Sequence, residues 1–308
     1  MRIFSDKNNF ASGSSALLTT GDYCRITGLA IDANNALSGM LDAVDIGGTH
    51  NSIDGRALIE NGYHNVNCGT VQVDGLQLKD AEFIGSGADN IYLPGHCGNV
   101  RMTGDLVESS GTNGVYFGGD DLTISGGVIE ESPGNGLDIE SAHEVTACET
   151  YYDIDGNQTA GAAAIRIANS TTVAICGNHF QRSGGDAAGS AHIVFSGKDS
   201  NITFSGNVYR TNSSNGDPNV RPWYVYDAET GTTLVNSHFY ENPRPGRRRL
   251  VAERRGSRPA GLAGAADRTQ QLCRTDAVGL QPDHTLPNRA HLCGRSSGRR
   301  RATVSILL

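Results

Sequence analysis

Two acidic residues and one arginine have the spacing that glycoside hydrolysis would need. Asp138 and Glu140 stand two residues apart in the short run LDIE, and Arg166 stands in the similar run IRI. On a β-strand, residues i and i+2 share a face about 6.5–7 Å apart. Inverting glycosidases hold their acid and base about 6.5–9.5 Å apart, so one carboxyl would protonate the leaving oxygen while the other activates a water. Arg166 would bind a carboxylate or sulfate group of the sugar.

A second chemistry, β-elimination, is left open by the same part of the sequence. Arg166, His192 or Tyr116 would remove the proton beside a uronate carboxylate, and a bound cation or an arginine would neutralise the developing charge. Ca²⁺ is expected only if the chain is a lyase, and no other cofactor or metal is predicted. Asp120 and Asp121 could bind such an ion, but a plain turn before the next apolar run is the preferred interpretation.

Four further residues are predicted to bind a sugar chain, because they flank the acidic pair on one outward face. They are Tyr92, Tyr116, His192 and Tyr224. Flat aromatic rings suit pyranose rings, and polar tips orient them. A structural interpretation stands beside this one, since tyrosine is favoured on strands by β-propensity alone. Asp138 and Arg166 could likewise form no more than a surface ion pair that contributes about 0–1 kcal/mol.

A repeat of 22 to 30 residues must position these side chains. Short apolar runs bounded by Gly, Asn, Asp or Ser recur through the middle of the chain, which is typical of strands and turns. One set of runs is IYL (91–93), VYF (115–117), LDI (137–139), IRI (165–167), IVF (193–195) and WYV (223–225). In each run the apolar flanks point inward, so the middle residue points outward.

The predicted fold is all-β, a single-stranded parallel β-helix with three short strands per coil. A repeat of this length without helical segments is the signature of a β-solenoid. Successive coils would stack strand on like strand about 4.8 Å apart. One core column is predicted to contain Leu78, Val107, Ile129, Tyr151, Phe180, Tyr209 and Phe239.

Three segments are predicted along the chain. Residues 1–23 are polar and form an N-terminal tail or remnant, residues 24–243 form the β-helix, and residues 244–308 are an Arg-rich extension, disordered or non-native. This extension contains 14 Arg, no Lys and 4 acidic residues, so the net charge of −8 for the whole chain leaves about −18 for residues 1–243.

Composition and patterning argue against several partners and locations. No run of 18 apolar residues is present, so no membrane-spanning segment is expected, and the N-terminus lacks the pattern of a signal peptide. The acidic body argues against nucleic acid as the partner. The seven cysteines lack paired spacing. Cys148 and Cys176 fall at nearly equivalent places in adjacent coils and are interpreted as small core residues rather than as a disulfide.

Several phrases resemble the coils of the pectate lyase superfamily of right-handed parallel β-helices, which includes polysaccharide lyases, glycoside hydrolases and phage tail spikes with carbohydrate-binding and sugar-hydrolysis repeats. They are ITGLAIDANN (26–35), NGVYF (113–117), GNGLDIES (134–141), AIRIAN (164–169) and ITFSGN (202–207). The resemblance implies a right-handed coil and a polysaccharide bound along one strand face. The polygalacturonase pattern of this superfamily is only partly present. Asp89 and Arg166 match it, while its paired aspartates, histidine and lysine are absent.

The sequence therefore predicts a polysaccharide-degrading enzyme that acts on a glycan along one face, by hydrolysis or β-elimination, in a secreted or phage-associated setting. The alternative is a non-catalytic glycan-binding or structural β-helix, such as a tail-spike shaft. Nothing after Asn242 resembles a polar cap for the last coil. We therefore expect a homotrimer or end-to-end association.

Overall fold

The computed structural model describes the backbone of residues 2–4, 15–19, 21–33, 41–69, 71–183, 190–210, 223–225 and 238–239. Side chains are described for residues 21–33, 41–69, 71–183 and 190–209. The Arg-rich extension predicted for residues 244–308 lies outside the described residues.

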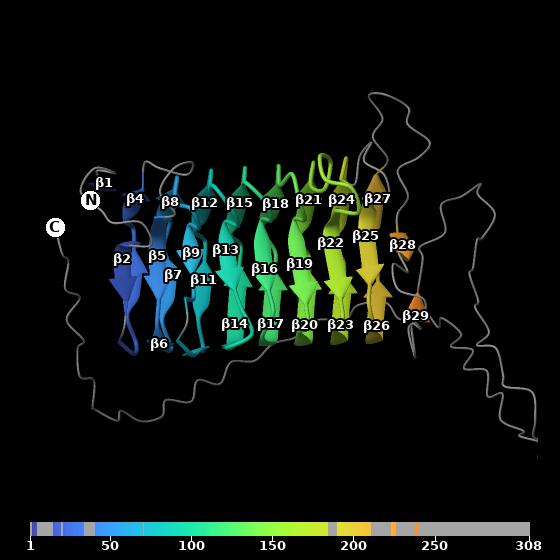
Figure 1. Ribbon diagram of the computed structural model, residues 1–308, viewed down its shortest axis with the longest axis horizontal. Helices are drawn as coiled ribbons and strands as arrows, with labels where there is room; N and C mark the ends of the chain where they lie inside the picture. Colours follow the sequence, from blue (N-terminus) through green and yellow to red (C-terminus); the bar gives the residue numbers. More distant parts are fainter. Residues whose placement is uncertain are drawn as a thin grey trace, which may run out of the picture. The chain divides into compact units, whose positions relative to one another are not determined.

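The described chain is a parallel β-helix in which each coil crosses three sheets in turn (Figure 1). All strand pairs are parallel, and most join a strand to its counterparts in the coils before and after. The predicted all-β solenoid with three strands per coil is therefore confirmed. None of the described segments is a helix of the length and apolarity needed to cross a membrane.

Sheet A and sheet B each have nine strands. Sheet A contains β1 (Arg2–Phe4), β4 (Ala30–Asp32), β8 (Leu58–Glu60), β12 (Glu82–Ile84), β15 (Leu106–Glu108), β18 (Val128–Glu130), β21 (Tyr151–Asp153), β24 (His179–Gln181) and β27 (Val208–Arg210). Sheet B contains β2 (Ser15–Thr19), β5 (Asp42–Ile46), β9 (Val66–Asn67), β13 (Ile91–Leu93), β16 (Val115–Phe117), β19 (Leu137–Glu140), β22 (Ala163–Ala168), β25 (Ala191–Ser196) and β28 (Trp223–Val225). Strands β1 and β2 both lie within residues 1–23, so pairing in the sheets starts before residue 24.

Sheet C has eleven strands and closes each coil. Its main path contains β3 (Arg25–Thr27), β7 (Ser52–Asp54), β11 (Gln77–Lys79), β14 (Cys97–Thr103), β17 (Asp120–Ser125), β20 (His143–Cys148), β23 (Thr171–Cys176), β26 (Ser200–Ser205) and β29 (His238–Phe239). Two short strands, β6 (Gly48–Thr49) and β10 (Val73–Asp74), join it beside that path.

The core column of sheet A differs from the predicted one at three positions. Register places these residues opposite one another: Ile31, Ile59, Phe83, Val107, Ile129, Tyr152, Phe180 and Tyr209. Leu78 and Phe239 belong to sheet C. Tyr152, not Tyr151, continues the column, and its ring stacks on Phe180 at 5.2 Å between centroids.

The turn from sheet C to sheet A explains the slip at Tyr151. In most coils one residue in the left-handed conformation precedes the first sheet A position, and Gly104 and Gly177 fill this place with φ of 68° and 64°. Glycine adopts that conformation without steric cost. In the coil that leads to β21, Glu149 adopts it instead, with φ of 59°. Aligning the coils by their glycines therefore places Tyr151 in the core column, one residue before the residue that occupies it.

Polar side chains inside this same corner link successive coils. The residue after the left-handed position accepts a hydrogen bond from the backbone of the preceding coil: Thr150 N donates to Asn178 Oδ1 at 2.9 Å, and Asn178 N donates to Asn207 Oδ1 at 3.0 Å. Asp105 does the same for Ala81 N at 3.0 Å. Burial raises the pKa of Asp105 to about 7, although hydrogen bonds from the backbone of Ala81 and Thr103 oppose the rise.

A disulfide joins Cys148 and Cys176 across adjacent strands of sheet C. The prediction that these cysteines are merely small core residues was wrong. They lie directly opposite each other at the ends of β20 and β23, with their Cα atoms 4.6 Å apart, which suits a disulfide. The sequence pattern could not reveal this pair, because exact register decides whether two such residues meet.

Candidate functional site

The outward column of sheet B is the one predicted from the sequence. Register places the following residues opposite one another on successive strands: Tyr92, Tyr116, Asp138, Arg166, Val194 and Tyr224. The column continues toward the N-terminus through Asn67 and Asp45. We call these residues, with Asp42, Glu140 and the corner residues that precede each strand, the sheet B face.

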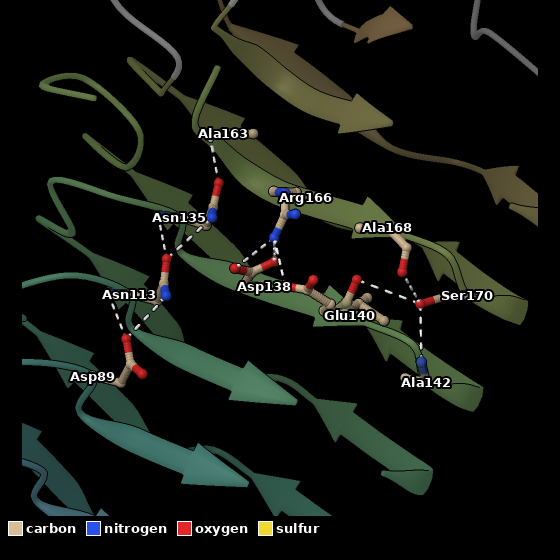
Figure 2. Close-up of polar contacts among 11 residues, drawn as sticks. Asp89, Asn113, Asn135, Asp138, Glu140, Ala142, Ala163, Arg166, Ala168 and Ser170 are labelled. Atoms are coloured by element: carbon tan, nitrogen blue, oxygen red, sulfur yellow. Dashed lines mark hydrogen bonds and ion pairs between the residues drawn. The ribbon is translucent and has the colours of Figure 1, made fainter. Parts of the chain in front are cut away.

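Arg166 joins the two predicted catalytic carboxylates (Figure 2). Its Nη1 donates to both oxygens of Asp138, at 2.7 and 2.9 Å, and to Glu140 Oε2 at 3.1 Å. The Asp138 side chain is 7% exposed, Arg166 25% and Glu140 39%. The structure therefore brings all three predicted catalytic residues together, with one carboxyl buried beneath the guanidinium and the other open to solvent.

The environment of Asp138 favours its protonated form. Burial raises its pKa to about 6, although the charge of Arg166 and its hydrogen bonds oppose the rise, and the nearby carboxylates of Glu140 and Asp89 add to it. Burial lowers the pKa of Arg166, but Asp138 and Glu140 outweigh that effect and hold it above its ordinary value. The site thus pairs a carboxyl that can carry a proton near neutral pH with a guanidinium that stays charged.

A ladder of polar side chains runs beside this cluster at the corner before sheet B (Figure 2). Asp89 Oδ1 accepts hydrogen bonds from Thr112 Oγ1 and from both nitrogens of Asn113. Asn113 Oδ1 accepts from Asn135 N at 2.8 Å, and Asn135 Oδ1 accepts from Ala163 N at 2.9 Å. Each of these hydrogen bonds fixes the backbone just before the next sheet B strand, so the ladder fixes the position of the outward column.

The two tyrosines present edges rather than faces to the solvent. The rings of Tyr92 and Tyr116 stack on each other at 5.1 Å between centroids and 22° between planes, and His64 stacks on Tyr92 at 5.0 Å. Ring faces that cover one another are unavailable to a pyranose. Burial, and next the charge of Glu140, raises the pKa of Tyr116 to about 12. Tyr116 is therefore a neutral hydroxyl that can donate a hydrogen bond.

His64 and Asp42 form part of the face that the sequence analysis missed. His64 Nδ1 lies 2.9 Å from Asp42 Oδ1, and its backbone N donates to the same oxygen at 3.0 Å. Asn67 Nδ2 donates to Asp42 Oδ2 at 2.6 Å. Asp42 begins β5, whereas His64 lies two residues before β9, Val66–Asn67, which is only two residues long. Such a short run gives no alternation from which an outward position could be read.

His192 is not on the outward face, which corrects its predicted role in sugar binding. It is 1% exposed, and its ring lies 5.9 Å from Phe180 and 5.8 Å from Tyr209, both residues of the sheet A core column. The equivalent place in an earlier coil is Gly114, where an added Cβ would lie 2.8 Å from Ile129 Cγ2. His192 is the second residue of β25, and at this end of the strand simple alternation of inward and outward residues fails.

The remaining predicted positions contribute less to the described site. Val194 is 2% exposed and packs with Ala163 and Ala191. Tyr224 continues the column in register, but its side chain lies outside the described residues. Asp120 and Asp121 belong to β17 rather than to a turn before it. Within the residues that the structure describes, no group of three or more His, Cys, Asp or Glu has an arrangement that could hold a metal ion.

Comparisons with known proteins give likenesses of fold. Neither a protein-family model nor a curated protein matches the sequence. A surface adhesin of Streptococcus pneumoniae is 11% identical with a TM-score of 0.48, over 76% of this chain and 62% of that one. Tailspike protein 2 from Escherichia coli O157:H7 bacteriophage CAB120 is 12% identical with a TM-score of 0.49, over 70% of this chain and 33% of that one.

An alginate lyase from Paenibacillus sp. str. FPU-7 is 13% identical with a TM-score of 0.47, over 74% of this chain and 96% of that one. The match spans less than two thirds of the adhesin and tailspike chains. At this level of identity the likeness concerns the fold alone.

Proposed function

We propose that this chain binds a glycan along the sheet B face and hydrolyses it, with Asp138 as general acid and Glu140 as nucleophile. The observation that carries the proposal is the unequal environment of the two carboxyls on one guanidinium. Asp138 is buried with a pKa raised to about 6, whereas the Glu140 side chain is 39% exposed. In glycosidases, two neighbouring carboxyls take different roles because their environments give them different pKa values.

Arg166 has a different effect on each of the two carboxyls. Its charge opposes the rise in the pKa of Asp138, and its contact with Glu140 Oε2 at 3.1 Å orients the exposed carboxylate. Protonation of Asp138 frees one of its oxygens to donate to a glycosidic oxygen. Because one nitrogen contacts Asp138 and Glu140 Oε2, these oxygens lie no more than about 6 Å apart, which is less than inverting glycosidases need and corrects the expected separation. Glu140 would therefore attack the sugar carbon as the protonated oxygen leaves, and water, deprotonated by Asp138, would then release the sugar from Glu140.

The elimination route is less well supported, because each predicted base is unsuited to it. His192 lies in the interior, and Arg166 is held in its charged form by two carboxylates. Tyr116 has a pKa raised to about 12, so it gives up a proton less readily than an ordinary tyrosine. Hydrolysis needs none of these groups as a base.

A second candidate function is glycan binding without cleavage. The observation that favours it is that both oxygens of Asp138 accept hydrogen bonds from Arg166 while the side chain is only 7% exposed. A carboxyl held in this way forms a structural ion pair unless the substrate displaces the guanidinium.

The two candidates are separated by measuring binding and cleavage on the same variants. The full chain, Asp138→Asn and Glu140→Gln are compared on a panel of polysaccharides, with Glu82→Gln on the outward face of sheet A as the matched control. Hydrolysis predicts that each site variant lowers reducing-end release by about 10²–10⁴-fold, that binding persists and that the control is unaffected. Binding without reducing-end release from any polysaccharide would replace hydrolysis by the second candidate.

A further inference from the structure

The sheet B face is strongly acidic for a surface that meets a polysaccharide. Its described residues include five carboxyl groups, the buried ones of Asp42, Asp89 and Asp138 and the more exposed ones of Asp45 and Glu140. Among the side chains described on the sheet B strands from β5 to β25, Arg166 is the only arginine or lysine. The carboxylates are close enough to affect one another, since Asp42 raises the pKa of Asp45 after burial does, and Asp89 contributes to the raised pKa of Asp138.

The single guanidinium is already neutralised. Arg166 Nη1 bonds to Asp138 at 2.7 and 2.9 Å and to Glu140 at 3.1 Å, so two carboxyls share one positive charge. With Glu140 ionised, an acidic sugar that approached Arg166 would meet negative charge beside it. The expectation that Arg166 binds a uronate or sulfate therefore lacks the free cation that such binding needs.

We propose that the glycan recognised by the sheet B face carries no carboxylate or sulfate groups, so that it is a neutral or amino-sugar polymer. This inference rests on the proposed function and narrows it to a substrate class. Like charges near a protein surface repel across several ångströms, and mobile salt screens that repulsion. Neutral sugar hydroxyls can instead donate to the carboxylates and accept from the hydroxyls of Tyr92 and Tyr116.

The chemistry of cleavage is consistent with this substrate class. β-Elimination needs a uronate, because the carboxylate acidifies the neighbouring proton that the base removes. Hydrolysis needs only a leaving oxygen to protonate and a water to activate, so it proceeds on a neutral glycan. The charge of the face and the division of roles between Asp138 and Glu140 therefore favour the same reaction.

The test measures affinity of the full chain for three polymers at low and high salt. A neutral xylan or glucan, a glucosamine polymer and a polygalacturonate or alginate are each cast into native gels. Mobility shifts then give the relative affinities. We expect the neutral or amino polymer to bind at least tenfold more tightly than the polyuronate at low salt, with the gap narrowing as salt rises.

Charge variants show whether the face itself sets the preference. Glu140→Gln and Asp45→Asn should each raise the affinity for the polyuronate and so reduce the difference in affinity between the polymers. Glu82→Gln on sheet A should leave that difference unchanged. A polyuronate that binds the full chain more tightly than the neutral polymers, and less tightly as salt rises, would overturn the substrate class while leaving glycan binding intact. Failure of all three polymers to bind would overturn the proposed function and this inference together.

Discussion

Asp138 and Arg166 lie directly opposite each other on β19 and β22, and one guanidinium nitrogen holds both oxygens of the carboxylate. The pair is a consequence of register, because these two residues stand 28 positions apart in the chain. Glu140, on the same strand as Asp138, completes the cluster. Burial raises the pKa of Asp138 to about 6, and the contact with Arg166 opposes that rise.

Loss of Arg166 should make Asp138 a weaker acid. Arg166 lowers the pKa of Asp138 by charge and by hydrogen bonding, so Arg166→Gln should raise that pKa above about 6. The measurement is carbon-detected NMR titration of the aspartate side chains. Arg182→Gln is the matched control, because Arg182 pairs with Asp153 on sheet A instead. An unchanged Asp138 titration in Arg166→Gln would show that the contact does not persist in solution.

Stability should rise as the pH is lowered from about 8 to about 5. Burial raises the pKa of Asp105 and of Asp199 from 3.8 to about 7 in the folded chain. Each carboxyl therefore binds its proton more tightly when folded. The stability from that proton is fully present below about 4 and is lost as the pH rises through about 7. Thermal unfolding across this range measures the effect.

Asp199→Asn should remove part of this pH dependence and raise the melting temperature at pH 8. Asp199 Oδ1 accepts from Ser170 N at 2.8 Å, and an amide oxygen can keep this bond without a buried charge. Asp120→Asn, on an exposed residue, is the control. A melting temperature of Asp199→Asn that falls at pH 8 would show that the ionised carboxylate is stabilising instead.

The disulfide should contribute roughly 2–4 kcal/mol to the free energy of unfolding, since it closes a long loop. Cys148→Ser should therefore shift the denaturant midpoint downward and remove its sensitivity to reductant. Cys24→Ser is the control, because Cys24 is a free cysteine. Peptide mapping that found Cys148 and Cys176 as free thiols in oxidised protein would contradict the assignment.

Gly114, at the sheet B corner, should tolerate alanine poorly. A Cβ at this position would lie 2.7 Å from Gly136 O and 2.8 Å from Ile129 Cγ2, so Gly114→Ala should cost about 1–3 kcal/mol by overpacking. At Gly95 the nearest atom would be 3.3 Å away, so Gly95→Ala should be milder. Equal denaturant midpoints for the two variants would show that the corner has room to relax.

The outward column could be predicted because the sheet B runs alternate cleanly. In the runs centred on Tyr92, Tyr116, Asp138 and Arg166, apolar flanks identify the inward positions, and the parallel register then aligns the middle residues. The same reasoning failed where backbone geometry departs from alternation. Glu149 takes a left-handed turn that glycine marks elsewhere, and this moved Tyr151 out of the column that Tyr152 occupies.

The corner geometry at His192 and the stacking of the tyrosine rings could not be predicted from the sequence for a similar reason. His192 was assigned outward by counting two residues back from Val194, but alternation fails at that end of the strand and the ring enters the core. The tyrosines were correctly aligned, yet neighbouring strands bring their rings face to face, so they offer edges to a ligand. Contacts between coils depend on exact register, and a single sequence carries no direct signal of it.

The pH dependence of glycan hydrolysis tests the central claim most directly. If Asp138 is the general acid, reducing-end release should be highest at acidic pH and fall as the pH rises through about 6. The fall occurs because the deprotonated carboxyl no longer protonates the leaving oxygen. Asp138→Asn should abolish this fall in reducing-end release with rising pH, together with most of the activity. Release that is flat or increases above pH 6, or products with the ultraviolet absorbance of unsaturated sugars, would contradict hydrolysis by Asp138 and Glu140.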